Sequence, residues 1–164
     1  MQVPSEFPGR QPAGLDRFVD AARVAVIGQS MGGSAVLYAV DRELAAQYNE
    51  RFRTAIAYYP NCGVTGAWMT APTLVLIGEA DDWTPTAPCR QMVKRARTDG
   101  AAITLTVYPG ACHAFDVVEL KPGIRVLGHS VEYNEPAARD AEQKVRAFLA
   151  ANLGGPSADE PAEK

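Results

Sequence analysis

A chain of 164 residues with 47% hydrophobic and 21% charged residues is long enough for one domain with a core, and this composition excludes a disordered protein. The net charge of -3 is spread along the sequence, without a block of lysine and arginine that could follow a phosphate backbone or an acidic membrane. We therefore expect neither a nucleic-acid nor a membrane partner.

No apolar run is long enough to cross a bilayer, and the first residues lack the basic and apolar regions of a signal peptide. This pattern predicts a cytoplasmic location, or export if a longer N-terminus precedes this one. The Pro- and Gly-rich residues 1–14 predict an irregular leader, 15–153 a partial domain, and the polar residues 154–164 a disordered tail.

Helical spacing of apolar residues and short apolar runs bounded by glycine or proline predict the elements of this domain. In chain order they are the last turns of a helix over 15–22, a strand over 23–27, a helix over 34–48, strands over 54–59 and 73–77, a helix over 87–98, a strand over 103–108 and a helix over 136–151. Strands buried on both faces and alternating with helices are typical of a parallel sheet. We predict an α/β fold of three layers, with about four strands and helices on both faces.

The strongest motif is Gly28-Gln29-Ser30-Met31-Gly32, a GxSxG sequence between a predicted strand and a predicted helix. In such a turn the serine is strained and raised above the sheet, and we expect side chains at either flanking glycine to clash. Gly33 is expected to extend this clearance to the packing of helix on strand. The turn aims the helix N-terminus at Ser30, where the backbone N–H of Met31 can donate to a developing oxyanion. We interpret Ser30 as a nucleophile; the alternative is a turn that merely connects two elements.

An acidic loop, Gly78-Glu79-Ala80-Asp81-Asp82-Trp83-Thr84-Pro85, follows the third predicted strand. A carboxylate in this loop lies at the carboxyl edge of a parallel sheet, which also carries Ser30. Asp81 and Asp82 compete for the role of the acid, and the spacing from the flanking glycine and proline favours Asp81. The alternative role for Asp82 is to cap or hydrogen-bond the turn.

A histidine in Tyr108-Pro-Gly-Ala-Cys-His-Ala-Phe115 follows the fourth predicted strand. From there His113 can accept the serine proton through one ring nitrogen while a carboxylate holds its tautomer through the other. A lone surface or core histidine is the alternative, and that description also fits His129. The order Ser30, Asp81, His113 is the one expected for the α/β-hydrolase fold, and we predict that these three residues form a catalytic triad.

The cysteines and histidines show neither CxxC nor HExxH spacing, so we expect no metal and no other cofactor. Buried structural thiols are the favoured prediction for Cys62, Cys89 and Cys112. A Cys62–Cys89 bridge is the alternative, because both residues follow strand ends on the same expected face. A redox role for Cys112 beside His113 is a more distant alternative.

At these motifs the chain resembles the dienelactone hydrolase family of α/β-hydrolases. The resemblance runs from about Arg23 to Leu149, through Val26-Ile-Gly-Gln-Ser-Met-Gly-Gly33, Pro72-Thr-Leu-Val-Leu-Ile-Gly78 with Asp81-Asp-Trp-Thr-Pro85, and Tyr108 to Phe115. It implies metal-free hydrolysis of an ester or lactone through an acyl-enzyme. Ser30 would be the nucleophile, Asp81 the acid and His113 the base. Family members that open dienelactones carry a cysteine nucleophile, whereas position 30 is serine, so we expect general esterase action on a small-molecule ester or lactone.

Only about twenty residues precede the first predicted strand, where the α/β-hydrolase fold normally has several strands. We therefore expect a sheet truncated on its N-terminal side, with the strand over 23–27 at an exposed edge through which copies could associate. The second oxyanion donor normally comes from an early strand–helix loop, and its loss lowers turnover by roughly a hundred- to a thousandfold. The alternative function is a truncated, weakly active or inactive hydrolase fragment that serves only as a folded or interaction module.

Overall fold

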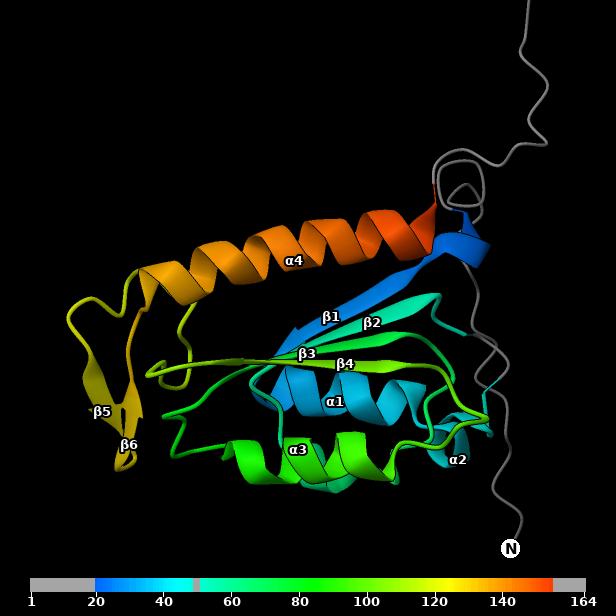
Figure 1. Cartoon of the computed structure of the whole chain (residues 1–164), viewed down its shortest axis with the longest axis horizontal. Coiled ribbons are helices and arrows are strands. Elements are labelled where there is room, and N and C mark those ends of the chain that lie inside the picture. The colour runs from blue at the N-terminus through cyan, green and yellow to red at the C-terminus, as the bar shows by residue number, and fades with distance from the viewer. Residues whose placement is uncertain (1–19, 49–50, 155–164) are drawn as a thin grey trace, which may run out of the picture.

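The computed structural model describes residues 20–48 and 51–154. Its centre is a sheet of four parallel strands in the spatial order β1-β2-β3-β4, the same as their order in the chain (Figure 1). The strands are β1 (Ala25–Gln29), β2 (Thr54–Tyr58), β3 (Thr73–Gly78) and β4 (Ile103–Tyr108). All four carboxyl ends therefore meet at one edge of the sheet.

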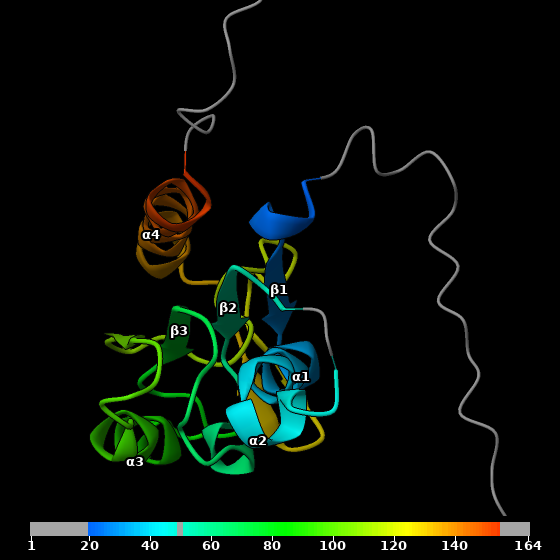
Figure 2. The same ribbon diagram turned by 90° about the vertical axis from the view of Figure 1, so that its right-hand side faces the viewer.

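Helices cover both faces of this sheet (Figure 1, Figure 2). One face carries α1 (Met31–Val40), α2 (Arg42–Ala45) and α3 (Thr86–Arg95), and the other carries the long helix α4 (Glu135–Leu153). The predicted three-layer α/β architecture with four parallel strands is confirmed. Each predicted strand agrees with the structure to within two residues.

The core lies between the two middle strands and the helices. Every residue of β3 is buried, and so is all of β2 except its last residue. By contrast β1 pairs only with β2 and is half-buried to exposed, with Ile27 51% exposed. Among the described residues β1 is thus an edge strand, as expected. Association of copies through this edge stays a prediction.

The predicted helix over 34–48 is wrong in its extent. The observed helix α1 begins earlier, at Met31, and ends before Asp41. Asp41 has an extended backbone and is the N-cap of the separate short helix α2. The buried carboxylate of Asp41 caps α2 by accepting the N–H groups of Glu43 and Leu44. It also accepts the Thr65 hydroxyl. The break therefore provides polar partners for a carboxylate inside the core.

Two short strands, β5 (Ile124–Val126) and β6 (His129–Val131), form an antiparallel hairpin where we expected only a loop. The hairpin lies beside the carboxyl edge of the main sheet (Figure 1). Before β1 the described chain forms a single 3-10 turn, η2 (Ala21–Arg23), at the end of the helix expected over 15–22. The leader over 1–14, most of that helix and the tail beyond Gly154 lie outside the described residues.

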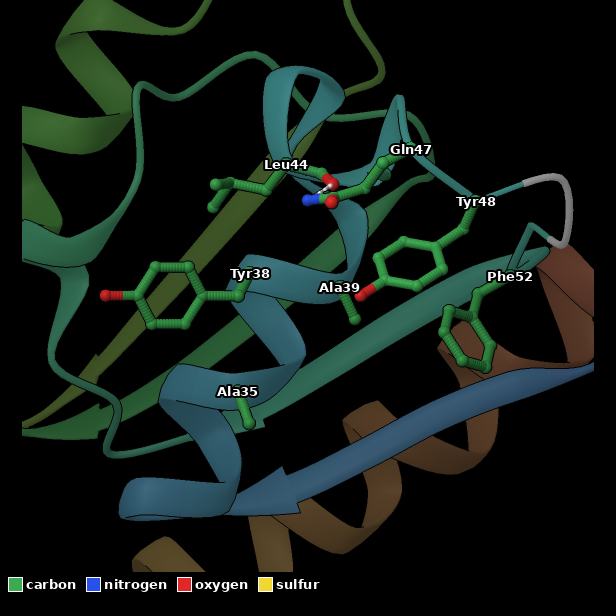
Figure 3. Close-up of a pocket in the computed structure, with 8 residues that line it drawn as sticks. Ala35, Tyr38, Ala39, Leu44, Gln47, Tyr48 and Phe52 are labelled. Carbon is green, nitrogen blue, oxygen red and sulfur yellow. Dashed lines mark hydrogen bonds between the residues drawn. The ribbon is translucent and has the colours of Figure 1, made fainter. Parts of the chain in front are cut away.

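A groove of about 500 Å³ runs along the exposed side of α1 and α2 (Figure 3). It is lined by Ala35, Tyr38, Ala39, Leu44, Ala45, Gln47, Tyr48 and Phe52. The candidate catalytic residues do not line it. No helix within 20–48 and 51–154 has the length and apolarity that crossing a bilayer would require.

Candidate active site

Ser30 lies in the turn between β1 and α1, with a φ of 53° that non-glycine residues rarely adopt. The turn is held at both ends, because the Ser30 N–H donates to the Tyr58 carbonyl at 3.0 Å and the Ser30 carbonyl accepts the Ser34 N–H at 3.0 Å. A strained serine between strand and helix is the geometry predicted from the GxSxG motif.

The glycines around Ser30 differ in what they must avoid. A Cβ on Gly28 would lie 2.3 Å from the Gly32 carbonyl oxygen, and one on Gly33 would lie 2.7 Å from the Tyr58 carbonyl oxygen. A Cβ on Gly32 would meet nothing within 4 Å. The expected clearance is confirmed for Gly28 and Gly33 and wrong for Gly32, because the close contact is made by the backbone of residue 32 with the Cβ position of residue 28.

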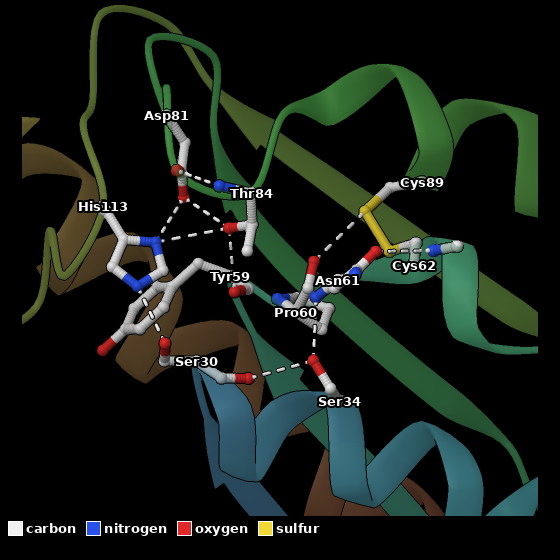
Figure 4. The surroundings of a disulfide bond; sticks show 11 residues. Ser30, Ser34, Tyr59, Pro60, Asn61, Cys62, Asp81, Thr84, Cys89 and His113 are labelled. Atoms are coloured by element: carbon white, nitrogen blue, oxygen red, sulfur yellow. Dashed lines mark hydrogen bonds and ion pairs between the residues drawn. A yellow bond between two sulfur atoms is a disulfide. The ribbon is translucent and has the colours of Figure 1, made fainter. Parts of the chain in front are cut away.

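His113 follows β4 and is almost fully buried, with an exposed fraction of 3%. Its Nε2 lies 2.9 Å from the Ser30 hydroxyl oxygen, and its Nδ1 lies 2.8 Å from Oδ2 of Asp81 (Figure 4). Since a carboxylate can only accept, Nδ1 carries the proton and Nε2 is free to accept from the serine. The structure therefore joins Ser30, His113 and Asp81 in one hydrogen-bonded line. Their catalytic roles stay a prediction.

Asp81 is held by the loop that it begins. Its Oδ1 accepts the backbone N–H groups of Trp83 at 2.9 Å and Thr84 at 2.8 Å, and its Oδ2 faces His113 and the Thr84 hydroxyl. Burial opposes the charged form, but the hydrogen bonds from His113 and Thr84 outweigh it and hold the pKa of the Asp81 carboxyl below its usual range. A charged carboxylate is thus maintained beside His113.

Asp82 has other partners. Its side chain is 44% exposed, its Oδ1 accepts the Ser130 N–H at 3.0 Å, and its carbonyl oxygen lies 3.0 Å from Nδ1 of His129. The structure therefore brings Asp81, and not Asp82, to His113. His129 lies on β6 and stacks on the Trp83 ring with 4.9 Å between ring centroids, so it belongs to the attachment of the hairpin.

Several residues around this line were missed in the sequence. Tyr59 follows β2, packs its ring edge-on to His113 at 4.6 Å between centroids, and donates its hydroxyl to Asp116 at 2.8 Å. Asp116 also accepts from the amide of Gln29, the residue before the nucleophile candidate, at 2.6 Å. Burial and the charge of Asp116 raise the pKa of the Tyr59 hydroxyl. The one signal available was position, because Gln29 ends β1 and Tyr59 directly follows β2.

Cys62 and Cys89 form a disulfide that joins the 3-10 turn η3 (Cys62–Val64) to α3 (Figure 4). The favoured prediction of free thiols was wrong for this pair, and the bridge that we held as the alternative is present. Cys112 is a free, half-buried thiol whose pKa is raised by burial and by neighbouring carboxylates. Within the described ranges no group of three or more His, Cys, Asp or Glu side chains could hold a metal ion.

A parallel sheet with serine, histidine and aspartate hydrogen-bonded at its carboxyl edge defines the class of α/β-hydrolases. The model of the dienelactone hydrolase family matches residues 13–153, and the chain belongs to this family.

Solved structures agree with this fold. A putative dienelactone hydrolase from Klebsiella pneumoniae is 25% identical, with a TM-score of 0.62 over 80% of this chain and 53% of the other. Esterase 2 from Thermogutta terrifontis, phosphorylated by paraoxon, is 17% identical, with a TM-score of 0.64 over 85% and 58%. The carboxylesterase Cest-2923 from Lactobacillus plantarum is 18% identical, with a TM-score of 0.59 over 85% and 62%. The chain thus spans 53–62% of the length of these proteins. No curated protein matches its sequence.

Proposed function

We propose that this chain carries the catalytic residues of a serine hydrolase that cleaves a carboxylic ester or lactone through an acyl-enzyme. The observation that carries the proposal is the line from Ser30 Oγ to His113 Nε2 at 2.9 Å and from His113 Nδ1 to Asp81 at 2.8 Å. Membership of the dienelactone hydrolase family and the likeness to esterases support the same reaction class.

The reaction proceeds in two halves. As Ser30 Oγ attacks the carbonyl carbon, its proton passes to Nε2 of His113, and the buried Asp81 carboxylate stabilises the imidazolium. The bond from carbon to the leaving oxygen then breaks, and Nε2 returns its proton to the leaving alcohol. Water repeats the sequence on the acyl-serine, with its proton taken by His113, and the acid is released while Ser30 regains its hydrogen.

Charge on the carbonyl oxygen develops next to the start of α1. The Met31 N–H is the first of that helix and has no partner within it, so it can donate to the oxyanion, and the helix dipole favours the negative charge. The described residues hold no strand before β1, so a second donor from an earlier strand–helix loop is not among them. We expect full turnover to need such a donor.

A small-molecule ester or lactone is the substrate class that we propose. Esterase 2 of Thermogutta terrifontis is phosphorylated by paraoxon, which makes an organophosphorus reagent a suitable probe here. The serine at position 30 supports general esterase action over opening of dienelactones. The proposal covers the type of bond that is cleaved and does not specify the length of the acyl chain.

The test is intact-mass analysis after treatment with a fluorophosphonate probe. We expect one adduct on the natural chain and none on Ser30→Ala. Ser130→Ala is the matched control, because Ser130 uses only its backbone N–H in the contacts around the site, and this variant should be labelled like the natural chain. A chain that unfolds cooperatively and yet takes up no probe would refute the proposal.

A second candidate, an interaction module without activity, is favoured by the exposed edge strand β1 and the groove beside α1 and α2. It predicts no adduct together with concentration-dependent association in sedimentation experiments. A labelled monomer would decide against it.

A further inference from the structure

Thr84 lies between β3 and α3, three residues after Asp81. Its hydroxyl oxygen is within hydrogen-bonding distance of three groups: Asp81 Oδ2 at 2.9 Å, the Tyr59 carbonyl oxygen at 3.0 Å and His113 Nδ1 at 3.2 Å (Figure 4). The reaction proposed above uses none of these contacts. The hydroxyl thus lies against the acid, the base and the carbonyl of the residue that follows β2.

The hydrogens in this cluster can be assigned by counting donors. Asp81 can only accept, and Nδ1 of His113 supplies one hydrogen to its Oδ2. The single hydrogen of the Thr84 hydroxyl has two acceptors, and its bond to the charged carboxylate is stronger than its bond to the Tyr59 carbonyl. The lone pairs of the same oxygen are then available to the Nδ1–H of His113.

This arrangement restricts two motions. The Asp81 carboxylate receives four hydrogen bonds, two on each oxygen, so rotation about its Cβ–Cγ bond would break all of them. The His113 ring finds an oxygen on either side of its Nδ1–H, which keeps this proton directed at the acid while Nε2 faces Ser30. Both restrictions depend on the hydroxyl, because the backbone N–H of Thr84 reaches only the other carboxylate oxygen.

We propose that Thr84 is a positioning residue of this hydrolase, whose hydroxyl holds Asp81 and His113 in register for proton transfer from Ser30. The inference rests on the proposed function. Thr84 does not contact the reacting atoms, so its removal should slow the chemical step and leave substrate binding unchanged.

The test compares Thr84→Val, which replaces the hydroxyl by a methyl group of similar size, with Thr84→Ser, which keeps it. We expect Thr84→Val to lower kcat for a soluble ester, and the rate constant of fluorophosphonate labelling, by roughly 10- to 100-fold, the effect of one hydrogen bond to a charged group. KM should stay within about threefold, and Thr84→Ser should stay within about threefold of the natural chain in both rates.

A second readout does not depend on activity. The low-field proton resonance of His113 Nδ1–H reports on the hydrogen bonds of this proton, and it should move in Thr84→Val and keep its position in Thr84→Ser. If Thr84→Val loses stability but keeps both this resonance and the labelling rate, Thr84 only supports the loop and the inference is overturned. If Thr84→Val does not fold, Thr84→Ala, which removes the hydroxyl together with the γ-methyl group, carries the same expectation.

Different outcomes would contradict the proposed function and the positioning role of Thr84. A natural chain that folds but is not labelled contradicts the proposed function, while the resonance still tests whether Thr84 holds His113. A natural chain that is labelled, with Thr84→Val labelled equally fast, contradicts the role of Thr84 alone.

Discussion

Asp81 and Asp82 are adjacent in the chain, and their carboxylates bind different parts of the molecule: Asp81 is buried against His113, and Asp82 accepts the Ser130 N–H of the β5–β6 hairpin. Because of the path of one loop, two adjacent aspartates have different partners. This separation makes a matched pair of variants available.

Asp81→Asn keeps the shape of the side chain but removes the charge that orients His113 and stabilises its protonated form. We expect the labelling rate of Ser30 to fall by about a thousand- to ten-thousandfold. Asp82→Asn keeps an oxygen that can accept the Ser130 N–H and loses only an exposed charge near His129, so it should stay within about fivefold of the natural chain. Labelling kinetics with a fluorophosphonate measure both, and an equal loss in the two variants would contradict the assignment of Asp81.

The lowered pKa of Asp81 predicts how stability depends on pH. A carboxyl whose pKa is lower in the folded state stabilises the fold above its unfolded pKa of about 3.9, and this contribution is lost as pH falls through the folded value. Asp81→Asn lacks the contribution at every pH. The difference in free energy of unfolding between the natural chain and Asp81→Asn should therefore shrink as the pH falls below the unfolded pKa and through the lower folded one. Urea unfolding at several pH values measures it, and a constant difference would contradict the prediction.

The contrast between Gly28 and Gly32 predicts opposite effects of the same substitution. Gly28→Ala places a Cβ 2.3 Å from a backbone oxygen, and the backbone shift that it forces should cost about 2–4 kcal/mol. Gly32 lies in α1 with open space around its Cβ position, so Gly32→Ala should be neutral or stabilise the fold by up to about 1 kcal/mol. Denaturant unfolding measures the stability of both variants. A loss of stability in Gly32→Ala would contradict the prediction.

The disulfide between Cys62 and Cys89 closes a loop with a sequence separation of 27 residues. The loss of chain entropy in the unfolded state predicts a stabilisation of about 3.5 kcal/mol for such a loop. The double variant Cys62→Ala/Cys89→Ala should lose this amount in denaturant unfolding, and the natural chain should lose it in the presence of a reducing agent. Cys112→Ala is the control, since it removes a free thiol and should respond to the reductant as the natural chain does.

A cytoplasmic location stays a prediction, and disulfides are uncommon in reducing cytosol.

The four strands of the main sheet could be predicted because each is a local apolar run bounded by glycine or proline. The break at Asp41 could not, because its partners Thr65 and Gly66 are 24 and 25 residues away. The hairpin was hidden for another reason. Its two-residue turn, Leu127-Gly128, has positive φ at both positions, where Asn-Gly is the usual signal and leucine is not.

The line of Ser30, His113 and Asp81 was anticipated because parallel strands place the residues after their ends at one edge. The choice between Asp81 and Asp82 rested on spacing alone, and only the fold shows which carboxylate turns inward. Thr84 and Asp116 could not be found in this way, because their contacts with Tyr59 join parts of the chain 25 and 57 residues apart. The pairing of Cys62 with Cys89 likewise depends on how η3 packs on α3.

The long helix α4 ends at the side of the sheet remote from the site, next to the turn η2 that leads into β1 (Figure 1). The guanidinium of Arg23 donates there to the carbonyl oxygens of Leu153 and Gly154, at 2.7 and 2.5 Å. The two ends of the described range therefore lie close together, at the amino end of β1, whereas Ser30 follows its carboxyl end. Affinity tags, fluorescent reporters or a fused enzyme could be attached at either flank without obstructing the approach of substrate, and joining the two flanks by a short linker would allow new chain ends to be opened elsewhere.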